Sequence, residues 1–227
     1  MTTGVSHAEA VRGAFVTAIG RLDMDQVAPA ANALAERLRD GGLLYVLGCG
    51  HSQVLAFEGY YRAGAPAWVA PLLDDRVSAA RGAACTDAER REGIGRELVG
   101  RLDATTARAL LVISSGGRNA VPIEAALTAR EAGLLTLALT SGGRGNRLVE
   151  LVDHALVTKV PSGDAVVQVG DALMTPLSTV TGAVLLHALL AETEARLSDA
   201  AVLVSVNVEG GEAHNQSLMQ RYPHLRA

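Results

Sequence analysis

Leu43-Leu44-Tyr45-Val46-Leu47-Gly48-Cys49-Gly50-His51-Ser52 is the clearest structural signal in this sequence. Its first five residues form a short, mainly apolar run closed by glycines, which predicts a buried strand. The residues that follow, 51–62, have the spacing of a helix. A buried strand, a glycine-rich turn and a helix in this order are typical of the repeating unit of a parallel α/β sheet.

The same alternation continues along the chain. Clear strands are expected at 106–113 and 134–139, shorter ones at 67–70 and 154–158, and a strand or extended segment at 201–206. Helices are expected at 6–19, 23–39, 51–62, 87–102, 119–132, 146–151, 177–197 and 213–221. This pattern predicts an α/β fold, a doubly wound parallel sheet flanked by helices in three flavodoxin-like layers. Residues 1–42 are expected to form a helical extension that packs on the core or on a dimer partner, and residues 43–227 the α/β domain.

Composition narrows the class of protein. Hydrophobic residues make up 49% of the 227 and aromatic ones only 3%, so the core is expected to consist mainly of Ala, Leu and Val. The formal net charge of −4 argues against a nucleic-acid partner. The sequence has no secretory-signal pattern and no apolar window long enough to span a bilayer, which favours a cytoplasmic protein without a membrane partner. Two cysteines, Cys49 and Cys85, are too few for a disulfide framework.

The chemistry is expected in the loops that follow the strands, because ligands of parallel α/β sheets bind at the carboxyl ends of the strands. In the first loop Gly50 lets the backbone approach an oxyanion, and Ser52 adds a hydroxyl at the start of a helix. This loop lacks the third glycine of a dinucleotide-binding fingerprint. A glycine turn without a ligand is the alternative interpretation.

The second loop is the strongest phosphate-binding candidate. Ser114-Ser115-Gly116-Gly117-Arg118-Asn119 places two hydroxyls, two glycines and an amide at a strand-to-helix junction, and Arg118 adds a positive charge. Asn119 has helix capping as its alternative role. No Gly-Lys-Ser motif is present, which argues against hydrolysis of nucleoside triphosphates. A third loop, beginning at Thr140 and Ser141, repeats the composition.

The order of these motifs resembles the SIS (sugar isomerase) domain family. The matching features are Gly-x-Gly-x-Ser after the first strand and a serine-rich glycine loop after the next. Further matches are Pro161-Ser162-Gly163-Asp164-Ala165, Ser178-Thr179-Val180 and Ser205-Val206-Asn207-Val208-Glu209-Gly210-Gly211 with His214-Asn215. Together they are similar to a stand-alone branch of the family that itself resembles phosphoheptose isomerases. The resemblance runs from about residue 8 to residue 222.

The resemblance implies a phosphate pocket in the second loop. The family's hydroxyl positions fall on Ser114, Gly116 and Asn119, so two of the three hydroxyls are replaced here. Gly116 still offers a backbone N–H group, and the adjacent Ser115 a hydroxyl. Ser52, and Ser178 or Thr179 on the long helix, are implied contacts to the sugar or the phosphate.

The resemblance also implies candidates for acid–base catalysis. Glu58 falls in the interval where SIS isomerases and etherases carry a catalytic carboxylate, with a structural hydrogen bond as the alternative. His214, followed by Asn215, falls where SIS isomerases carry a histidine that reaches a neighbouring subunit's site. His51 is the alternative histidine, orienting the substrate or acting in place of His214. Asp164 is expected either to bind sugar hydroxyls or to form the turn.

These residues suggest a sugar-phosphate-processing enzyme that removes the proton from C2 of its substrate. The favoured reaction is elimination, as dehydratase or lyase, on an N-acetylhexosamine 6-phosphate such as N-acetylglucosamine 6-phosphate, because an acetylated amine at C2 prevents ketose formation. This chemistry is similar to that of N-acetylmuramic acid 6-phosphate etherases. The alternatives are an aldose–ketose isomerase of the phosphoheptose type and a non-catalytic sugar-phosphate sensor.

No cofactor or metal is expected, because the histidines and Glu58 have no recognised ligand spacing. A homodimer or higher homo-oligomer with sites at its interface is expected instead. The long apolar helix at 177–197 and the N-terminal helices carry more apolar surface than one sheet face needs.

Overall fold

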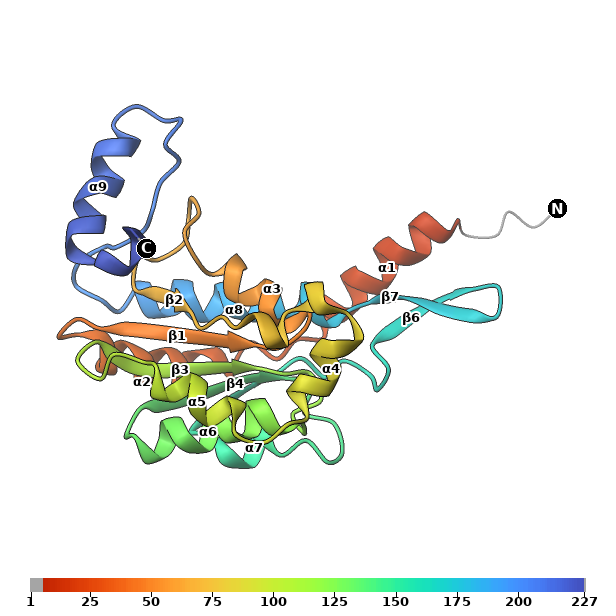
Figure 1. The fold of residues 1–227 in the computed structure, drawn as a ribbon. Coiled ribbons are helices and arrows are strands. Elements are labelled where there is room, and N and C mark those ends of the chain that lie inside the picture. The colour runs from red at the N-terminus through yellow and green to blue at the C-terminus, as the bar shows by residue number, and fades with distance from the viewer. Residues whose placement is uncertain (1–5, 227) are drawn as a thin grey trace.

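The computed structural model of the protein describes residues 6–226, and a five-stranded parallel sheet forms its centre (Figure 1). The strands are β1 (Leu43–Gly48), β2 (Val69–Pro71), β3 (Ala107–Ile113), β4 (Leu135–Thr140) and β5 (His154–Val157), in the spatial order β2-β1-β3-β4-β5. The order reverses after β1, so the carboxyl ends of β1 and β3 form the switch point of a doubly wound sheet. The predicted fold class is confirmed.

Helices cover both faces of the sheet. One face carries α2 (Val27–Leu38), α3 (Ser52–Glu58) and α8 (Ser178–Glu194), and the other carries α4 (Ala83–Glu89), α5 (Ile94–Gly100), α6 (Ala120–Glu131) and α7 (Leu148–Leu151). Each face has its own cluster of buried Ala, Leu and Val side chains. The first cluster also holds the single tryptophan, Trp68, whose indole N–H donates to Glu194 at 2.7 Å.

Two predicted helices differ from the structure, and one segment predicted as a strand or as extended takes the extended form. The helix expected at 87–102 is two helices, α4 and α5, because Gly93 between them has a φ of +94°. The helix expected at 51–62 ends at Glu58. The segment 201–206 is extended but joins no sheet, with a single isolated bridge between Val202 and Pro66.

A hairpin that the sequence analysis missed lies outside the sheet. Strands β6 (Ala165–Val169) and β7 (Ala172–Pro176) pair antiparallel and project from the body beside α1 (His7–Gly20), as Figure 1 shows. The two residues between the strands, Gly170 and Asp171, are a recognised hairpin signal, and Gly170 has the positive φ that such a turn needs. Ser6 caps α1, and its hydroxyl accepts from the N–H of Glu9 at 3.2 Å.

The chain ends in α9 (Gly211–Arg221) and a short 3-10 helix, Pro223–Arg226; two further 3-10 turns, Asp75–Val77 and Ala79–Arg81, precede α4. Figure 1 places α9 beyond the amino ends of the strands, away from the loops that follow β1 and β3. Of the two N-terminal helices, α2 buries six residues in the core and α1 buries none. Across residues 6–226, no helix combines the length and apolar character that a membrane crossing requires.

Candidate functional site

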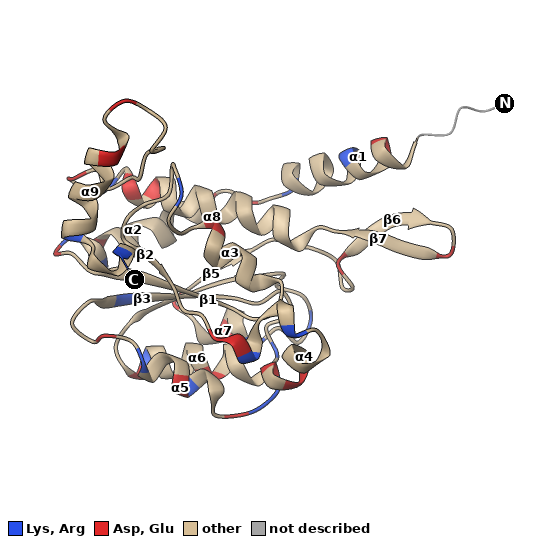
Figure 2. Ribbon diagram, turned by 45° about the horizontal axis from the view of Figure 1, so that its top comes forward, with Lys and Arg blue, Asp and Glu red and all other residues tan. Residues whose placement is uncertain are grey.

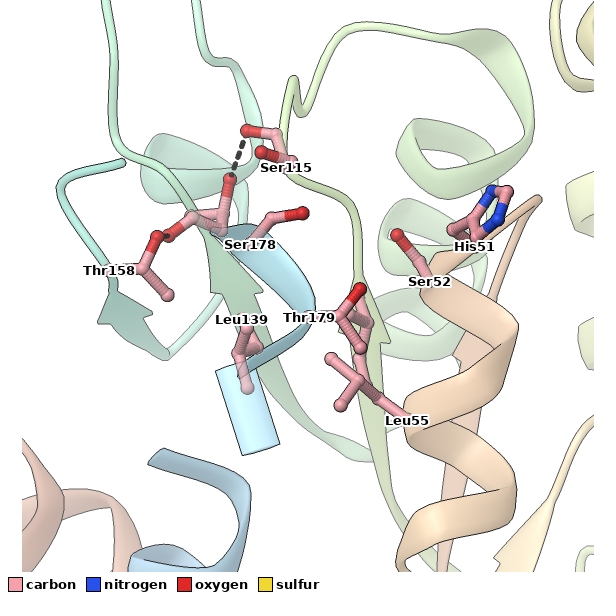
Figure 3. Close-up of a pocket in the computed structure, with 10 residues that line it drawn as sticks. His51, Ser52, Leu55, Ser115, Leu139, Thr158, Ser178 and Thr179 are labelled. Atoms are coloured by element: carbon pink, nitrogen blue, oxygen red, sulfur yellow. Dashed lines mark hydrogen bonds between the residues drawn. The ribbon is translucent and has the colours of Figure 1, made fainter. Parts of the chain in front are cut away.

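A small pocket opens at the carboxyl ends of the central strands. It encloses about 350 Å³ of space, part of it open to solvent. Its walls come from the loops after β1, β3, β4 and β5 and from the starts of α3 and α8 (Figure 3). Three lining residues are apolar, and the other seven are His51, Ser52, Ser115, Thr140, Thr158, Ser178 and Thr179. The lining therefore has many hydroxyls, and its one ionisable side chain is an imidazole.

Four of these polar side chains have no hydrogen-bond partner in the part of the chain that the structure describes. Within residues 6–226, no hydrogen bond is made by the hydroxyls of Ser52, Ser115 and Thr179 or by the imidazole of His51. Figure 3 shows His51 and Ser52 at the start of α3, across the pocket from Ser115 and from Thr179 on α8. Three hydroxyls and one imidazole are thus free to bind a ligand.

The other lining hydroxyls are already engaged in the scaffold. Thr140 donates to the carbonyl of Ser115 at 3.2 Å, and Thr158 donates to the carbonyl of Thr140 at 3.4 Å. Ser178 donates to Asp164 at 2.5 Å. These bonds hold the loops in place and leave fewer donors for a ligand.

The loop after β3 is held by its neighbour after β4. The carbonyl of Ser115 accepts from the Ser141 hydroxyl at 2.7 Å, from the Ser141 N–H at 3.1 Å and from the Asn146 amide at 3.2 Å. The hydroxyl of Ser114 turns inward and accepts from the N–H of Gly117 at 3.2 Å. Ser114 and Ser141 therefore shape the loop, whereas the hydroxyl of Ser115 faces the pocket.

Two adjacent glycines in this loop have different roles. Gly117 has a φ of +56°, and a Cβ built on it would lie 2.1 Å from Oδ1 of Asn146, so the position requires glycine. A Cβ on Gly116 would meet nothing within 4 Å, and Gly116 is exposed. Gly116 stands where the family's motif has a serine, and no neighbouring atom in the structure requires a glycine there. Asn146 also holds this loop, and the sequence gives no sign of it because its partners, Ser115 and Thr140, lie in other segments of the chain.

Arg118 and Asn119 follow these glycines but do not line the pocket. Both line a separate cavity on the α4 and α6 side of the loop. Asn119 occupies the N-cap position of α6, where its side chain makes no capping hydrogen bond. Gly50 does not line the pocket; it has a φ of +56° and donates its N–H to the carbonyl of Val77 at 2.8 Å.

Asp164 acts at the start of α8. Its carboxylate accepts from the N–H groups of Leu177 at 2.9 Å and Ser178 at 2.8 Å, as well as from the Ser178 hydroxyl. Negative charge is favourable at this end of a helix, where N–H groups lack partners. Asp164 thus positions the helix end that presents Thr179 to the pocket.

Glu58 lies at the opposite end of α3 from the pocket. It pairs with Arg62 and with Nε2 of His187 at 3.0 Å, and it is not a lining residue. The hydrogen bond from His187, together with the nearby Arg62 charge, lowers the pKa of Glu58. The carboxylate is therefore held in its ionised form by partners of its own chain.

His214 and Asn215 lie on α9. Nε2 of His214 is 2.9 Å from the carbonyl of Val202. The Asn215 side chain accepts from the N–H of Val204 and donates to the Val204 carbonyl, at 3.0 and 2.8 Å. Both residues thus fix the extended segment before α9, and neither reaches the pocket of its own chain.

Cys49 is buried beneath the first loop, and burial raises the pKa of its thiol far above the ordinary value. A thiol held in this way is a packing group, since the thiolate is the reactive form. Among residues 6–226, His, Cys, Asp and Glu side chains do not gather in any group of three or more that could hold a metal ion.

Comparison with known proteins places the chain in a family. The sequence model of the SIS domain matches residues 9–141, and the chain therefore belongs to the SIS domain family. A UPF0309 protein of Brucella canis is 39% identical over 217 residues, which cover 88% of this chain and 90% of that protein. A UPF0309 protein of Listeria monocytogenes is 34% identical over 88% of each chain.

Solved structures share the fold at low identity. The phosphoheptose isomerase of Neisseria gonorrhoeae has a TM-score of 0.54 and 18% identity, covering 84% of this chain and 100% of that one. The sugar isomerase domain of an RpiR transcription factor from Sphaerobacter thermophilus has a TM-score of 0.53 and 17% identity, covering 97% of both chains. The predicted family resemblance is confirmed.

Proposed function

We propose that the protein binds a phosphorylated sugar in the pocket at the strand ends and removes the proton from C2 of its open-chain form. The unpartnered hydroxyls of Ser52, Ser115 and Thr179 are the observation that carries the proposal. Unpaired hydroxyls lining a pocket suit a ligand rich in oxygen acceptors. Family membership supports the same assignment, since the SIS domain is a sugar isomerase domain and a structural neighbour is a phosphoheptose isomerase.

We assign the proton transfer to His51. It is the one ionisable side chain among the pocket-lining residues, and a general base must come within hydrogen-bond reach of the proton that it takes. An imidazole can accept and return a proton near neutral pH. Glu58, at the far end of α3, then acts as a structural carboxylate, because Arg62 and His187 already occupy it.

The substituent at C2 decides the fate of the sugar. When C2 carries an acetylated amine, as in N-acetylglucosamine 6-phosphate, loss of the C2 proton is followed by departure of the C3 hydroxyl as water. The product has a C2–C3 double bond conjugated with the C1 aldehyde, and no oxidant or cofactor is consumed. When C2 carries a hydroxyl, return of the proton to C1 gives a ketose. Elimination on an N-acetylhexosamine 6-phosphate is the favoured reaction, and isomerisation of an aldose phosphate is the alternative.

A sensor without catalysis is the second candidate function. The observation in its favour is that the lining has no carboxylate, the base that many proton-abstracting sites use. The RpiR transcription factor whose sugar isomerase domain shares this fold is a regulator by its name. Binding without proton exchange is the behaviour expected of a sensor.

We also propose that the protein functions as a homodimer, with α1 of the N-terminal extension against the second copy. Val16 of α1 and Leu173 and Met174 of β7 are exposed, at 66%, 58% and 56%. A two-stranded hairpin is marginally stable on its own, so these projecting elements need a covering surface. Light scattering of the unmodified protein should give twice the mass of one chain. The double variant Leu173→Glu with Met174→Glu should give the mass of a monomer. An unmodified protein that is monomeric would contradict the proposal.

Incubation in D₂O, followed by NMR, tests the reaction. The substrates are N-acetylglucosamine 6-phosphate and sedoheptulose 7-phosphate, with the unphosphorylated N-acetylglucosamine as a control. Deuterium at C2 or a new alkene signal is expected for the first sugar, and exchange next to the carbonyl for the second. Saturable binding of either phosphate without exchange would exclude catalysis on these sugars and favour the sensor.

Two matched variants separate the candidate bases. His51→Asn should reduce exchange by at least about 100-fold, which is the usual contribution of a positioned base. Glu58→Gln should leave exchange within several-fold and sugar-phosphate binding unchanged. If Glu58→Gln loses exchange and His51→Asn retains it, Glu58 is the base, as the family resemblance implied.

A further inference from the structure

A second polar cavity lies on the outer side of the loop that shapes the sugar pocket. It is open to solvent, encloses about 740 Å³ and shares no lining residue with the pocket. Its walls come from the end of α4, the start of α6 and the loop before α7. The charged residues at its rim are Arg90, Arg118, Arg147, Glu92 and Glu124.

The positive charges of this cavity have no counter-charges bound to them. Within residues 6–226, the guanidinium groups of Arg90, Arg118 and Arg147 form no ion pair and no hydrogen bond. The arginines of the neighbouring α5 region behave differently, because Arg76 and Arg101 both pair with Asp74. Figure 2 shows Lys and Arg positions in the loops between α4 and α7, on a chain whose net charge is −4.

One of the two carboxylates in the cavity is already engaged. Glu124 accepts from the N–H of Gly93 at 2.7 and 2.8 Å and from the N–H of Gly95 at 3.2 Å, which ties it to the start of α5. Glu92 is exposed and makes no ion pair within the described part of the chain. Three guanidinium groups thus face one unengaged carboxylate.

The arginines on the two loops are held in a fixed relation. The N–H of Arg147 donates to the carbonyl of Gly117 at 2.9 Å, directly before Arg118 in the chain. The side chain of Arg118 extends towards the loop after β4, where a Cβ built on Gly145 would lie 3.9 Å from its Cδ and Nη1. The loop backbones are therefore fastened to each other while both guanidinium groups remain unpaired.

We propose that this cavity is a second anion-binding site, which takes the dianion of a phosphomonoester between Arg118 and Arg147, with Arg90 at its rim. Guanidinium forks match the geometry of phosphate oxygens and bind them through paired, charge-assisted hydrogen bonds. Ala120 and Ile123 provide a short apolar wall for the carbon part of a small metabolite. The ligand is an effector, because the sugar pocket lies on the other side of the loop.

Inorganic phosphate is the probe that tests this site on the full chain. Backbone amide shifts are followed by NMR at constant ionic strength, with chloride as the comparison anion. Phosphate should shift the amides of Arg118, Asn119 and Arg147 with saturation, and chloride should not. The variant Arg118→Ala with Arg147→Ala should weaken this binding by at least about tenfold, because two charge-assisted contacts are lost.

A control variant changes the net charge by the same amount as Arg118→Ala with Arg147→Ala. Arg37→Ala with Arg39→Ala removes two exposed arginines at the end of α2 and should leave the phosphate shifts unchanged. If both double variants weaken binding equally, or if neither does, the cavity is not an anion site. Binding of a sugar phosphate in the pocket is followed at Ser52 and Ser115 in the same spectra, so failure of the proposed function is seen separately.

Discussion

The two ends of helix α3 differ in how their polar groups are satisfied. At its start, His51 and Ser52 face the pocket without a partner in the described chain. At its end, Glu58 is bound by both Arg62 and His187. Glu58 is six positions after Ser52 in the helix, a rise of about 9 Å.

This difference separates binding groups from scaffold groups. Polar groups that line a pocket without partners are available to a ligand, whereas paired ones already stabilise the fold. The same distinction divides the loop after β3, where the hydroxyl of Ser114 holds Gly117 and that of Ser115 is free. Residue type alone does not make this distinction, because serines and carboxylates occur in both groups.

The largest effect is expected from a substitution that breaks the scaffold of the loop. Gly117→Ala forces a Cβ to within 2.1 Å of Asn146 at a positive φ, and we expect the free energy of unfolding to fall by about 2–5 kcal/mol. Sugar-phosphate binding should be lost with it. The matched control, Gly116→Ala, has open space and an ordinary φ, and should change stability by less than about 0.5 kcal/mol. Chemical denaturation measures both; equal effects would show that Asn146 does not fix this loop.

A smaller effect is expected from removing the free hydroxyls. Ser52→Ala with Ser115→Ala should weaken sugar-phosphate binding by about 10- to 100-fold, because each hydroxyl gives one hydrogen bond to the ligand. The melting temperature should hardly change, since neither hydroxyl has a partner in the described protein. Calorimetric titration compares this variant with Ser217→Ala on α9, where binding should be unaffected. Unchanged affinity in the double variant would remove these hydroxyls from the site.

The smallest effect is expected at the paired end of α3. The pKa of Glu58 is lowered below its ordinary value of 4.5. The pairing of Glu58 therefore stabilises the fold at a pH above 4.5, and this stabilisation is lost as the pH falls through the lowered pKa. Glu58→Gln should cost about 1 kcal/mol or less at pH 7, because the side chain is 31% exposed. The difference from the unmodified protein should shrink as the pH is lowered from about 5 to about 3. If the difference in stability between the two proteins instead grows as the pH falls, the ion pairing of Glu58 is not the source of its contribution to stability.

Much of the fold could be predicted from the sequence, because its signals are local. The apolar run 43–47 and the glycine at 133 mark a strand and a helix end within a few residues. The break between α4 and α5 could not be predicted in this way, since Glu124 binds the N–H groups of Gly93 and Gly95 from another helix. The Gly170-Asp171 turn was a local signal for the hairpin and was missed.

The location of the pocket could be predicted from the sequence. Which of its polar groups are hydrogen-bonded within the protein could not. Glycine- and serine-rich loops predicted a pocket at the carboxyl ends of the strands, and a pocket lies there, while its ligand stays a prediction. Which hydroxyls are free depends on contacts over long sequence distances, such as Asn146 to Ser115. The role of Asp164 could not be predicted for the same reason. Its carboxylate binds the start of α8, and the whole β6–β7 hairpin lies between the two in the sequence.

A titration of the full chain with N-acetylglucosamine 6-phosphate, followed by backbone amide NMR, shows which end of α3 binds the ligand. Saturable shifts are expected at Ser52, Ser115 and Thr179, with little change around Glu58. Binding of the sugar without its phosphate should be at least 100-fold weaker, on the order of three kcal/mol. Equal shifts with and without the phosphate, or shifts confined to the Glu58 end of α3, would contradict the proposed function.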